Sequence, residues 1–407
     1  MQTGAGADNW VGTWATAVVA RPPQGATFLG QAEKSPLNFN NQTLRQIVRT
    51  SLGGDRLRVV LSNTFGTAPL PIGSARLALR DKGAAIVAQS DRPLTFGGRP
   101  AATIPPGAVI VSDPVSLKVP AFADLAVDIY LPGDTAAGTS PLTMHTAALQ
   151  TNYVSPPGNH VGAAALPVAT TTESWFFLAR VEVVAPRLTG AIAALGDSIT
   201  DGTSSTADTN NRWPNHVARR LAARKINMGV LNVAIAGNRV LSDGLGVNAL
   251  ARLDRDVLAQ PGVTHVIVLE GINDLGLPGM TREASRPGAA DLIAGHRQII
   301  ARARARGLKV YGGTLLPCEG VIFANYWTPE GEATRQAINQ WIRTGKEYDG
   351  VIDFDTVMRD PGAPTKLLPK YDSGDHLHPN DAGYQAMADA VSLELVKGGA
   401  LQRTGNQ

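Results

Sequence analysis

One serine, two loop residues and an aspartate–histidine pair stand out as residue types that could do chemistry together. Ser198 lies in GDSITDG, Gly237 in AGN and Asn273 in GIND. Asp375 and His378 both lie in DSGDHLHPNDAGY, near the C-terminal end. A serine hydroxyl is a weak nucleophile and needs a base within hydrogen-bond reach. Histidine supplies such a base because its ordinary pKa lies near neutrality.

The spacing of Asp375 and His378 suits this pair to assist a serine. The two residues are three positions apart, so a single turn of the chain can bring the carboxylate against the imidazole. A carboxylate on the far ring nitrogen fixes the tautomer and stabilises the imidazolium. A tetrahedral intermediate also needs donors where its negative charge develops, each worth about 3 kcal/mol. The amides of Ser198 and Gly237 and the side chain of Asn273 could be these donors.

Each of these residues also has an ordinary structural interpretation. Ser198 could cap a helix, Gly237 could permit a tight turn, and Asn273 could stabilise a loop. The segment H-L-H could present His376 and His378 as metal ligands, but the nearby sequence offers no convincing third ligand. The interpretation as a nucleophilic site therefore depends on whether the fold brings the residues together.

Several further residues are expected to support the structure rather than to react. Asp197 and Thr200 suit the turn after the first apolar run, and Asp274 suits a loop held by side-chain hydrogen bonds. His376 is expected at the rim of the site. The remaining histidines match no motif and are expected to be structural or exposed: His145, His160, His216, His265 and His296. The single cysteine, Cys318, is expected to be a packed thiol, because no base is assigned to it.

Residues 1–186 predict a β-rich unit. Segments 56–63, 124–131 and 175–184 are rich in β-branched residues or alternate apolar with polar ones, and turns rich in Gly, Pro and Asp separate them. No helical pattern of useful length interrupts this region. We therefore expect an all-β domain over 1–186, either an antiparallel sandwich or a jelly-roll-like unit.

From residue 187 onward, short apolar runs alternate with amphipathic helical stretches, the last of which spans 380–396. Runs buried on both faces and separated by helices predict a parallel, doubly wound sheet within a domain at 187–407. Such sheets bind ligands beyond the carboxyl ends of their strands, where these runs place the candidate residues. The runs lie at 191–195, 230–235, 265–270, 309–316 and 350–354.

Four short segments, in the order GDSITDG, AGN, GIND and DHLHPNDAGY, resemble the four sequence blocks of the SGNH (GDSL) hydrolase family. The segments NRWP and WVGTWATA are similar, more narrowly, to the XynE-like arylesterase/acylhydrolase subfamily. The resemblance implies a flavodoxin-like three-layer α/β/α domain that cleaves esters without a metal or organic cofactor. It implies Ser198 as nucleophile, with Asp375 and His378 completing a triad. It also implies that Gly237 and Asn273 join the Ser198 amide as oxyanion donors.

The subfamily resemblance favours short acyl groups, as in acetyl esters of carbohydrates or aryl esters. Three alternatives remain open at this point. The chain could be a lysophospholipase or thioesterase of the same family, or a catalytically silent carbohydrate-binding protein. A metal-dependent hydrolase that uses His376 and His378 is the third.

The overall composition is typical of a globular protein, with 43% hydrophobic and 17% charged residues. The net charge of +3 comes from scattered basic residues, so we expect no nucleic-acid partner. No apolar segment is long enough to span a membrane. The opening MQTGAGADNW lacks the basic and apolar regions of a signal peptide. We therefore expect a cytoplasmic protein, or a secreted or periplasmic one if a signal peptide was removed. The sequence does not indicate an oligomeric state.

Overall fold

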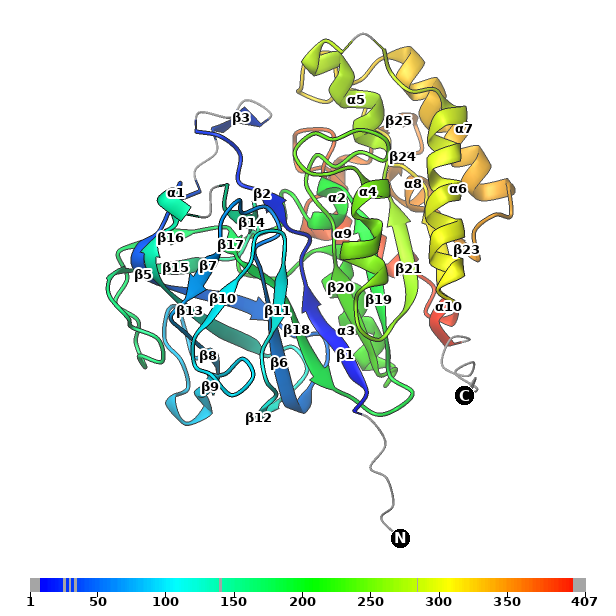
Figure 1. The fold of residues 1–407 in the computed structure, drawn as a ribbon. Coiled ribbons are helices and arrows are strands. Elements are labelled where there is room, and N and C mark those ends of the chain that lie inside the picture. The colour runs from blue at the N-terminus through cyan, green and yellow to red at the C-terminus, as the bar shows by residue number, and fades with distance from the viewer. Residues whose placement is uncertain are drawn as a thin grey trace.

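The chain forms an antiparallel β part followed by an α/β part built on a parallel sheet (Figure 1). The structure, a computed structural model, describes residues 8–24, 27–28, 31–32, 35–138, 141–283 and 285–397. Residues 1–7, which begin the segment considered as a signal peptide, lie outside the described residues. Within the described ranges, no helix combines the length and the apolar character needed to cross a bilayer.

Two larger antiparallel sheets make up most of the N-terminal part. One follows the order β16 (Thr170–Thr172), β15 (Asn152–Pro157), β5 (Asn40–Arg49), β13 (Asp124–Asp134), β8 (Ser74–Leu79) and β9 (Arg92–Leu94). The other follows β1 (Trp10–Ala15), β18 (Leu178–Val184), β6 (Gly54–Ser62) and β11 (Val109–Val111), and β12 (Val115–Val119) also pairs with β6. Four consecutive side chains at the end of β6 are fully buried, so this part of the strand is covered on both faces: Val59, Val60, Leu61 and Ser62.

Smaller sheets complete this part. A three-stranded sheet follows β17 (Trp175–Phe176), β14 (Thr143–His145) and β2 (Val19–Ala20). β7 (Leu70–Ile72) pairs with β10 (Ala102–Ile104), and β3 (Thr27–Phe28) pairs with β4 (Gln31–Ala32). The short helix α1 (Thr135–Gly138) follows β13. The β segment predicted at 175–184 is divided in the structure, because Phe177 has a φ of 56° and the chain passes there from β17 to β18 in another sheet.

The C-terminal part contains the predicted parallel sheet. Its order is β20 (Met228–Asn232), β19 (Gly190–Gly196), β21 (Val263–Leu269), β22 (Lys309–Gly313) and β23 (Gly350–Ile352), and each pair is parallel. In chain order this is 2-1-3-4-5, the order of flavodoxin-like sheets. Every residue of β19 is buried, as a central strand covered on both faces requires.

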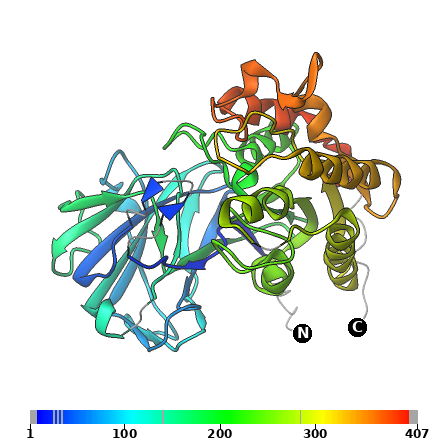
Figure 2. The same cartoon turned by 90° about the horizontal axis from the view of Figure 1, so that it is seen from above.

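Helices cover both faces of this sheet. The connections β19–β20 and β20–β21 run in opposite directions, so right-handed crossovers place α3 (Trp213–Ala223) and α4 (Ala249–Leu253) on opposite faces. Helix α9 (Asp381–Ala390) contacts α3, and α6 (Ala289–Ala305) contacts α4, which gives the layers of Figure 2. The other α-helices of this part, among the described residues, are α2 (Ser198–Asp201), α5 (Ile272–Thr281), α7 (Pro329–Thr344), α8 (Phe354–Met358) and α10 (Glu394–Lys397). A separate strand pair is formed by β24 (Arg359–Asp360) and β25 (Ala363–Leu367).

The sequence signals account for several helix ends. Pro214 lies in the first turn of α3, and the Thr328 side chain accepts from the Gly331 amide at the start of α7. Asn380 caps α9 in the same way. The expected helix over 380–396 is wrong in its second half, because α9 ends at Ala390 and Val391 adopts an extended backbone before α10.

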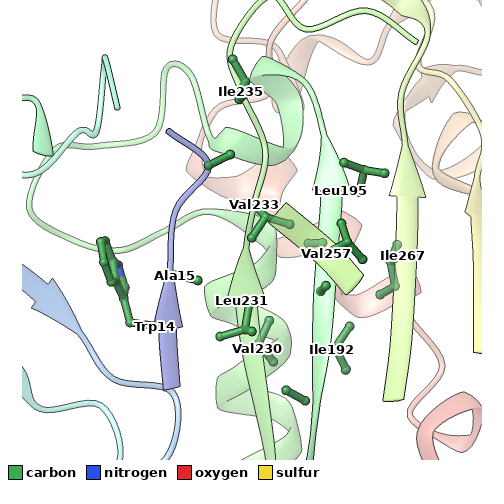
Figure 3. Close-up of a cluster of buried hydrophobic side chains, with 14 of the residues drawn as sticks. Trp14, Ala15, Ile192, Leu195, Val230, Leu231, Val233, Ile235, Val257 and Ile267 are labelled. Atoms are coloured by element: carbon green, nitrogen blue, oxygen red, sulfur yellow. The ribbon is translucent and has the colours of Figure 1, made fainter. Parts of the chain in front are cut away.

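The two parts share a continuous apolar core. Strand β1 lies along β20, the edge strand of the parallel sheet, and Figure 3 shows Ala15 on the side of β1 that faces Leu231. A Cβ on Gly229 of β20 would lie 2.4 Å from the Gly12 backbone carbonyl oxygen, so this close approach of the two strands requires glycine. The Val230 amide donates to the Ser51 hydroxyl at 3.0 Å. The boundary between 186 and 187 stays a prediction.

Candidate active site

Ser198 begins helix α2, directly beyond the carboxyl end of β19. The strand turns at Gly196, where a Cβ would lie 2.3 Å from Thr200 Oγ1, so a side chain there would overlap the turn. Asp197 caps the helix, and its Oδ1 accepts from the Ile199 amide at 2.9 Å. The predicted supporting role of Asp197 is confirmed, and the turn presents Ser198 rather than Asp197 at the edge of the sheet.

His378 contacts Ser198 across 180 positions of sequence. Its Nε2 lies 2.8 Å from Ser198 Oγ, and its Nδ1 lies 2.6 Å from Asp375 Oδ2. Ionised Asp375 can only accept, so Nδ1 carries the proton and Nε2 is left to accept from the serine hydroxyl. This is the arrangement in which a histidine can remove the proton of a nucleophile.

Asp375 is held in its ionised form by several donors. The amides of Leu377 and His378 donate to its Oδ1 at 2.9 and 2.8 Å. Burial acts to raise the pKa of the Asp375 carboxyl, but the hydrogen bond and charge of His378 and the two amides hold that pKa well below its ordinary value. The carboxylate therefore stays charged and keeps the His378 ring in a fixed orientation.

His376 lies apart from this chain of contacts. Its Nδ1 contacts Asp372 Oδ2, its φ is 62°, and 48% of its side chain is exposed. Both ring nitrogens of His378 are meanwhile engaged by Asp375 and Ser198. Among the described residues, no group of three His, Cys, Asp or Glu side chains is arranged to hold a metal ion. The rim position expected for His376 stays a prediction.

Gly237 lies in the turn that follows β20. Its φ of 74° is in the left-handed region, which glycine adopts without strain. The Asn238 amide donates to the Ile235 carbonyl at 3.0 Å and closes the turn around it. Within the described part of the chain, neither the Gly237 amide nor the Ser198 amide donates a hydrogen bond. Both amides are therefore free to donate to a bound group.

Asn273 lies in the first turn of α5, just beyond β21, and its side chain reaches the Gly237 turn. Its Nδ2 donates to the Asn238 carbonyl at 3.0 Å, and its Oδ1 accepts from the Tyr326 hydroxyl at 2.8 Å. Because Nδ2 carries two hydrogens, one remains for a ligand. Burial raises the pKa of Tyr326 well above its ordinary value, so the hydroxyl stays protonated and donates. Sequence reasoning missed Tyr326, which lies in no motif.

Three buried carboxyl groups lie close to the turns that carry the candidate site residues. Asp274 accepts from the amides of Val240 and Leu241 at 2.8 and 3.1 Å, which confirms its predicted structural role. Burial raises the pKa of Asp274 to about 6 and that of Asp197 to about 7. Sequence reasoning missed Glu270, whose carboxylate oxygens make no hydrogen bond to the described residues. Burial, followed by the nearby Asp197, raises the pKa of Glu270 well above its ordinary value.

Residues 194–386 match the GDSL-like lipase/acylhydrolase family, a segment that contains each of the five predicted site residues. No curated protein sequence matches the chain. Among solved structures, the aryl esterase of M. smegmatis is similar, with a TM-score of 0.40, 16% identity, and coverage of 52% of this chain and 99% of that one. A GDSL-like lipase from Bacteroides thetaiotaomicron VPI-5482 has a TM-score of 0.39, 16% identity, and coverage of 51% and 88%.

Proposed function

We propose that Ser198, His378 and Asp375 form the catalytic triad of this carboxylic ester hydrolase, whose residues 194–386 match the GDSL-like lipase/acylhydrolase family. The observation that carries this proposal is the chain of contacts from Ser198 Oγ through His378 to Asp375, at 2.8 and 2.6 Å. Nucleophile, base and orienting carboxylate are each within the reach that general-base catalysis needs.

In the first half of the proposed reaction, Ser198 Oγ attacks the ester carbonyl carbon while its proton passes to His378 Nε2. The carbonyl oxygen becomes an oxyanion, which accepts hydrogen bonds from the amides of Ser198 and Gly237 and from Asn273 Nδ2. The intermediate collapses, the bond to the alcohol oxygen breaks, and His378 returns its proton to the leaving alcohol. An acyl group remains on Ser198.

In the second half, water attacks the acyl carbonyl and gives a proton to His378 Nε2. The same donors accommodate the second oxyanion. Its collapse releases the carboxylic acid and returns the proton to Ser198 Oγ. Asp375 stabilises the imidazolium in both halves without taking its proton. No step of this scheme requires a cofactor.

The triad is tested by the Ser198→Ala variant with p-nitrophenyl acetate as substrate. We expect turnover to fall by at least about 10³-fold, because the nucleophile is gone. A fluorophosphonate probe should label the unaltered protein and not Ser198→Ala. Wild-type turnover in the variant would exclude the mechanism, and failure of the unaltered protein to react with the probe would favour a silent carbohydrate-binding protein.

For the substrate, we propose short acyl groups on aryl or carbohydrate alcohols. The support is the similarity of NRWP and WVGTWATA to the XynE-like subfamily. A series of p-nitrophenyl esters from acetyl to palmitoyl measures the preference, and the highest kcat/KM should fall at acetyl or near it. A preference for palmitoyl would favour the lysophospholipase or thioesterase alternative.

We also propose that 1–186 and 187–407 are the two domains of the chain. The change from antiparallel strands to the parallel sheet between β18 and β19 supports this division. Expression of residues 187–407 alone would test whether the second domain folds and hydrolyses esters without the first.

A further inference from the structure

His145, on strand β14 of the N-terminal part, contacts the helix that begins with Ser198. Its Nδ1 lies 2.8 Å from the Ala17 carbonyl, and its Nε2 lies 3.1 Å from Asp201 Oδ1 in α2. Both His145 and Asp201 are buried. The contact therefore joins the two parts of the chain out of reach of solvent, three residues after Ser198.

The partners of His145 determine where its protons lie. The Ala17 carbonyl can only accept, so Nδ1 carries a hydrogen, and the Asp201 carboxylate requires a second hydrogen on Nε2. The ring is then an imidazolium paired with a carboxylate. Burial acts to lower the pKa of His145, but Asp201 outweighs it and raises that pKa, even though the Arg212 guanidinium opposes the charge. Arg212 itself donates to the Asp201 backbone carbonyl at 2.7 Å.

The other oxygen of the same carboxylate holds the turn that contains Gly237. Asp201 Oδ2 accepts from the Ala236 amide at 3.2 Å, and Ala236 directly precedes Gly237. On the far side of the turn, the Asn238 carbonyl accepts from Asn273 Nδ2 at 3.0 Å. Gly237 thus lies between two residues whose backbone groups are fixed by buried side chains.

We propose that His145 is a positioning residue for ester hydrolysis, which acts by holding Asp201 so that the Gly237 amide keeps its direction. This proposal rests on the proposed function, in which that amide binds the oxyanion. It assigns the N-terminal part a role in the chemistry. Without the imidazolium, the buried Asp201 carboxylate loses its hydrogen-bonded cation and keeps only the charge of the nearby Arg212 guanidinium. It then turns toward water, which releases the Ala236 amide.

The test compares two substitutions of His145 with a control at the same interface. His145→Leu removes both hydrogen bonds and the charge, whereas His145→Gln keeps a side-chain donor for Asp201. Ser51→Ala breaks the hydrogen bond from the Val230 amide, which also joins the two parts but does not involve the Gly237 turn. Circular dichroism establishes that each variant is folded before its kinetics with p-nitrophenyl acetate are measured.

We expect His145→Leu to lower kcat by about 10-fold to 100-fold while KM changes by less than about 3-fold, because a misdirected oxyanion donor weakens transition-state binding. His145→Gln should lose less than about 5-fold, and Ser51→Ala should keep its kcat. Hydrogen exchange of a peptide covering 233–240 should be faster in His145→Leu and unchanged in Ser51→Ala, a result that does not depend on activity.

A folded His145→Leu variant with wild-type kcat would overturn the proposal, as would an equal loss of kcat in Ser51→Ala. Ser198→Ala, measured in the same assay, separates this failure from failure of the proposed function. If Ser198→Ala is inactive and His145→Leu is not impaired, only the role of His145 is wrong. If Ser198→Ala is active, the triad itself is wrong.

Discussion

The Tyr326 hydroxyl lies 2.8 Å from Asn273 Oδ1, and this hydrogen bond decides which end of the Asn273 amide faces the Gly237 turn. A hydroxyl that donates to the amide oxygen leaves the amide nitrogen on the opposite side, where it donates to the Asn238 carbonyl. The tyrosine therefore favours the orientation of Asn273 that the proposed oxyanion hole needs.

The first prediction concerns this hydrogen bond. Tyr326→Phe removes the donor but keeps the ring, so the Asn273 amide can invert and kcat should fall by about 10-fold with little change in KM. Tyr130→Phe is a matched control, because the Tyr130 hydroxyl donates to Asn41 Oδ1 at 2.6 Å in the N-terminal part. Steady-state kinetics with p-nitrophenyl acetate check both variants. Equal kcat values for Tyr326→Phe and the wild type would argue against a catalytic role for the Asn273 amide.

The second prediction concerns the carboxylate beside His378. Asp375→Asn should lower kcat by about 10⁴-fold, because an amide in this position favours the wrong tautomer of the histidine. Asp372→Asn changes a carboxylate that contacts His376 instead, and it should lose less than about 10-fold. The two variants differ by three positions in one loop, so a similar loss in both would mean that the loop, and not the orientation of His378, was disturbed.

The third prediction concerns the pH dependence of stability. Burial raises the pKa of Asp197 from 3.8 to about 7, so the folded protein binds this proton more tightly than the unfolded chain does. Protonation of Asp197 makes its full contribution to the unfolding free energy below about pH 4. This contribution falls by about 1.4 kcal/mol per pH unit and is lost as the pH rises through 7. Asp197→Asn has no such proton to lose.

Urea unfolding at pH 5, 6, 7 and 8 measures this effect. The difference in unfolding free energy, Asp197→Asn minus wild type, should increase by about 2 kcal/mol between pH 5 and pH 7. Asp55→Asn, at an exposed carboxylate, is the control and should follow the wild type. A constant difference between wild type and Asp197→Asn across this range would contradict the raised pKa.

The fourth prediction concerns the turn before the serine. Gly196→Ala places a Cβ 2.3 Å from Thr200 Oγ1 and 2.6 Å from the Leu269 backbone carbonyl oxygen, and both residues are buried. We expect a loss of about 3 kcal/mol in unfolding free energy, measured by urea denaturation, together with reduced kcat. At Gly133 a Cβ would meet nothing within 4 Å, so Gly133→Ala should change stability by less than about 0.5 kcal/mol.

The sequence alone was sufficient to predict the parallel sheet and the candidate residues at the carboxyl ends of its strands. Apolar runs in 191–195 and 265–270 had the length and composition of buried strands, and parallel pairing necessarily brings their carboxyl ends together. The sequence therefore predicted that Ser198 and Asn273 lie at the same edge of the sheet. His378 was identified by its spacing from Asp375 and by the motif, because its contact with Ser198 is set by tertiary structure alone.

Other features depended on contacts that no local pattern encodes. Tyr326 lies in an irregular loop, and its hydroxyl can donate to Asn273 only when that loop packs against α5. His145 was expected to be structural or exposed, because nothing near it in sequence indicates its approach to Asp201. The break at Phe177 was also missed, since a positive φ at a phenylalanine has no signature in an otherwise uniform β pattern.

The packing of β1 against β20 has a consequence for how copies of this chain meet one another. An uncovered edge strand offers its amides and carbonyls to any other chain, which is a common route to aggregation. Here the Val230 amide already donates to Ser51, and the β1 backbone lies so close that a methyl group on Gly229 of β20 would overlap the Gly12 carbonyl oxygen. A second molecule cannot add a strand at β20 without first displacing β1, so the chain itself protects this edge of the sheet from self-association.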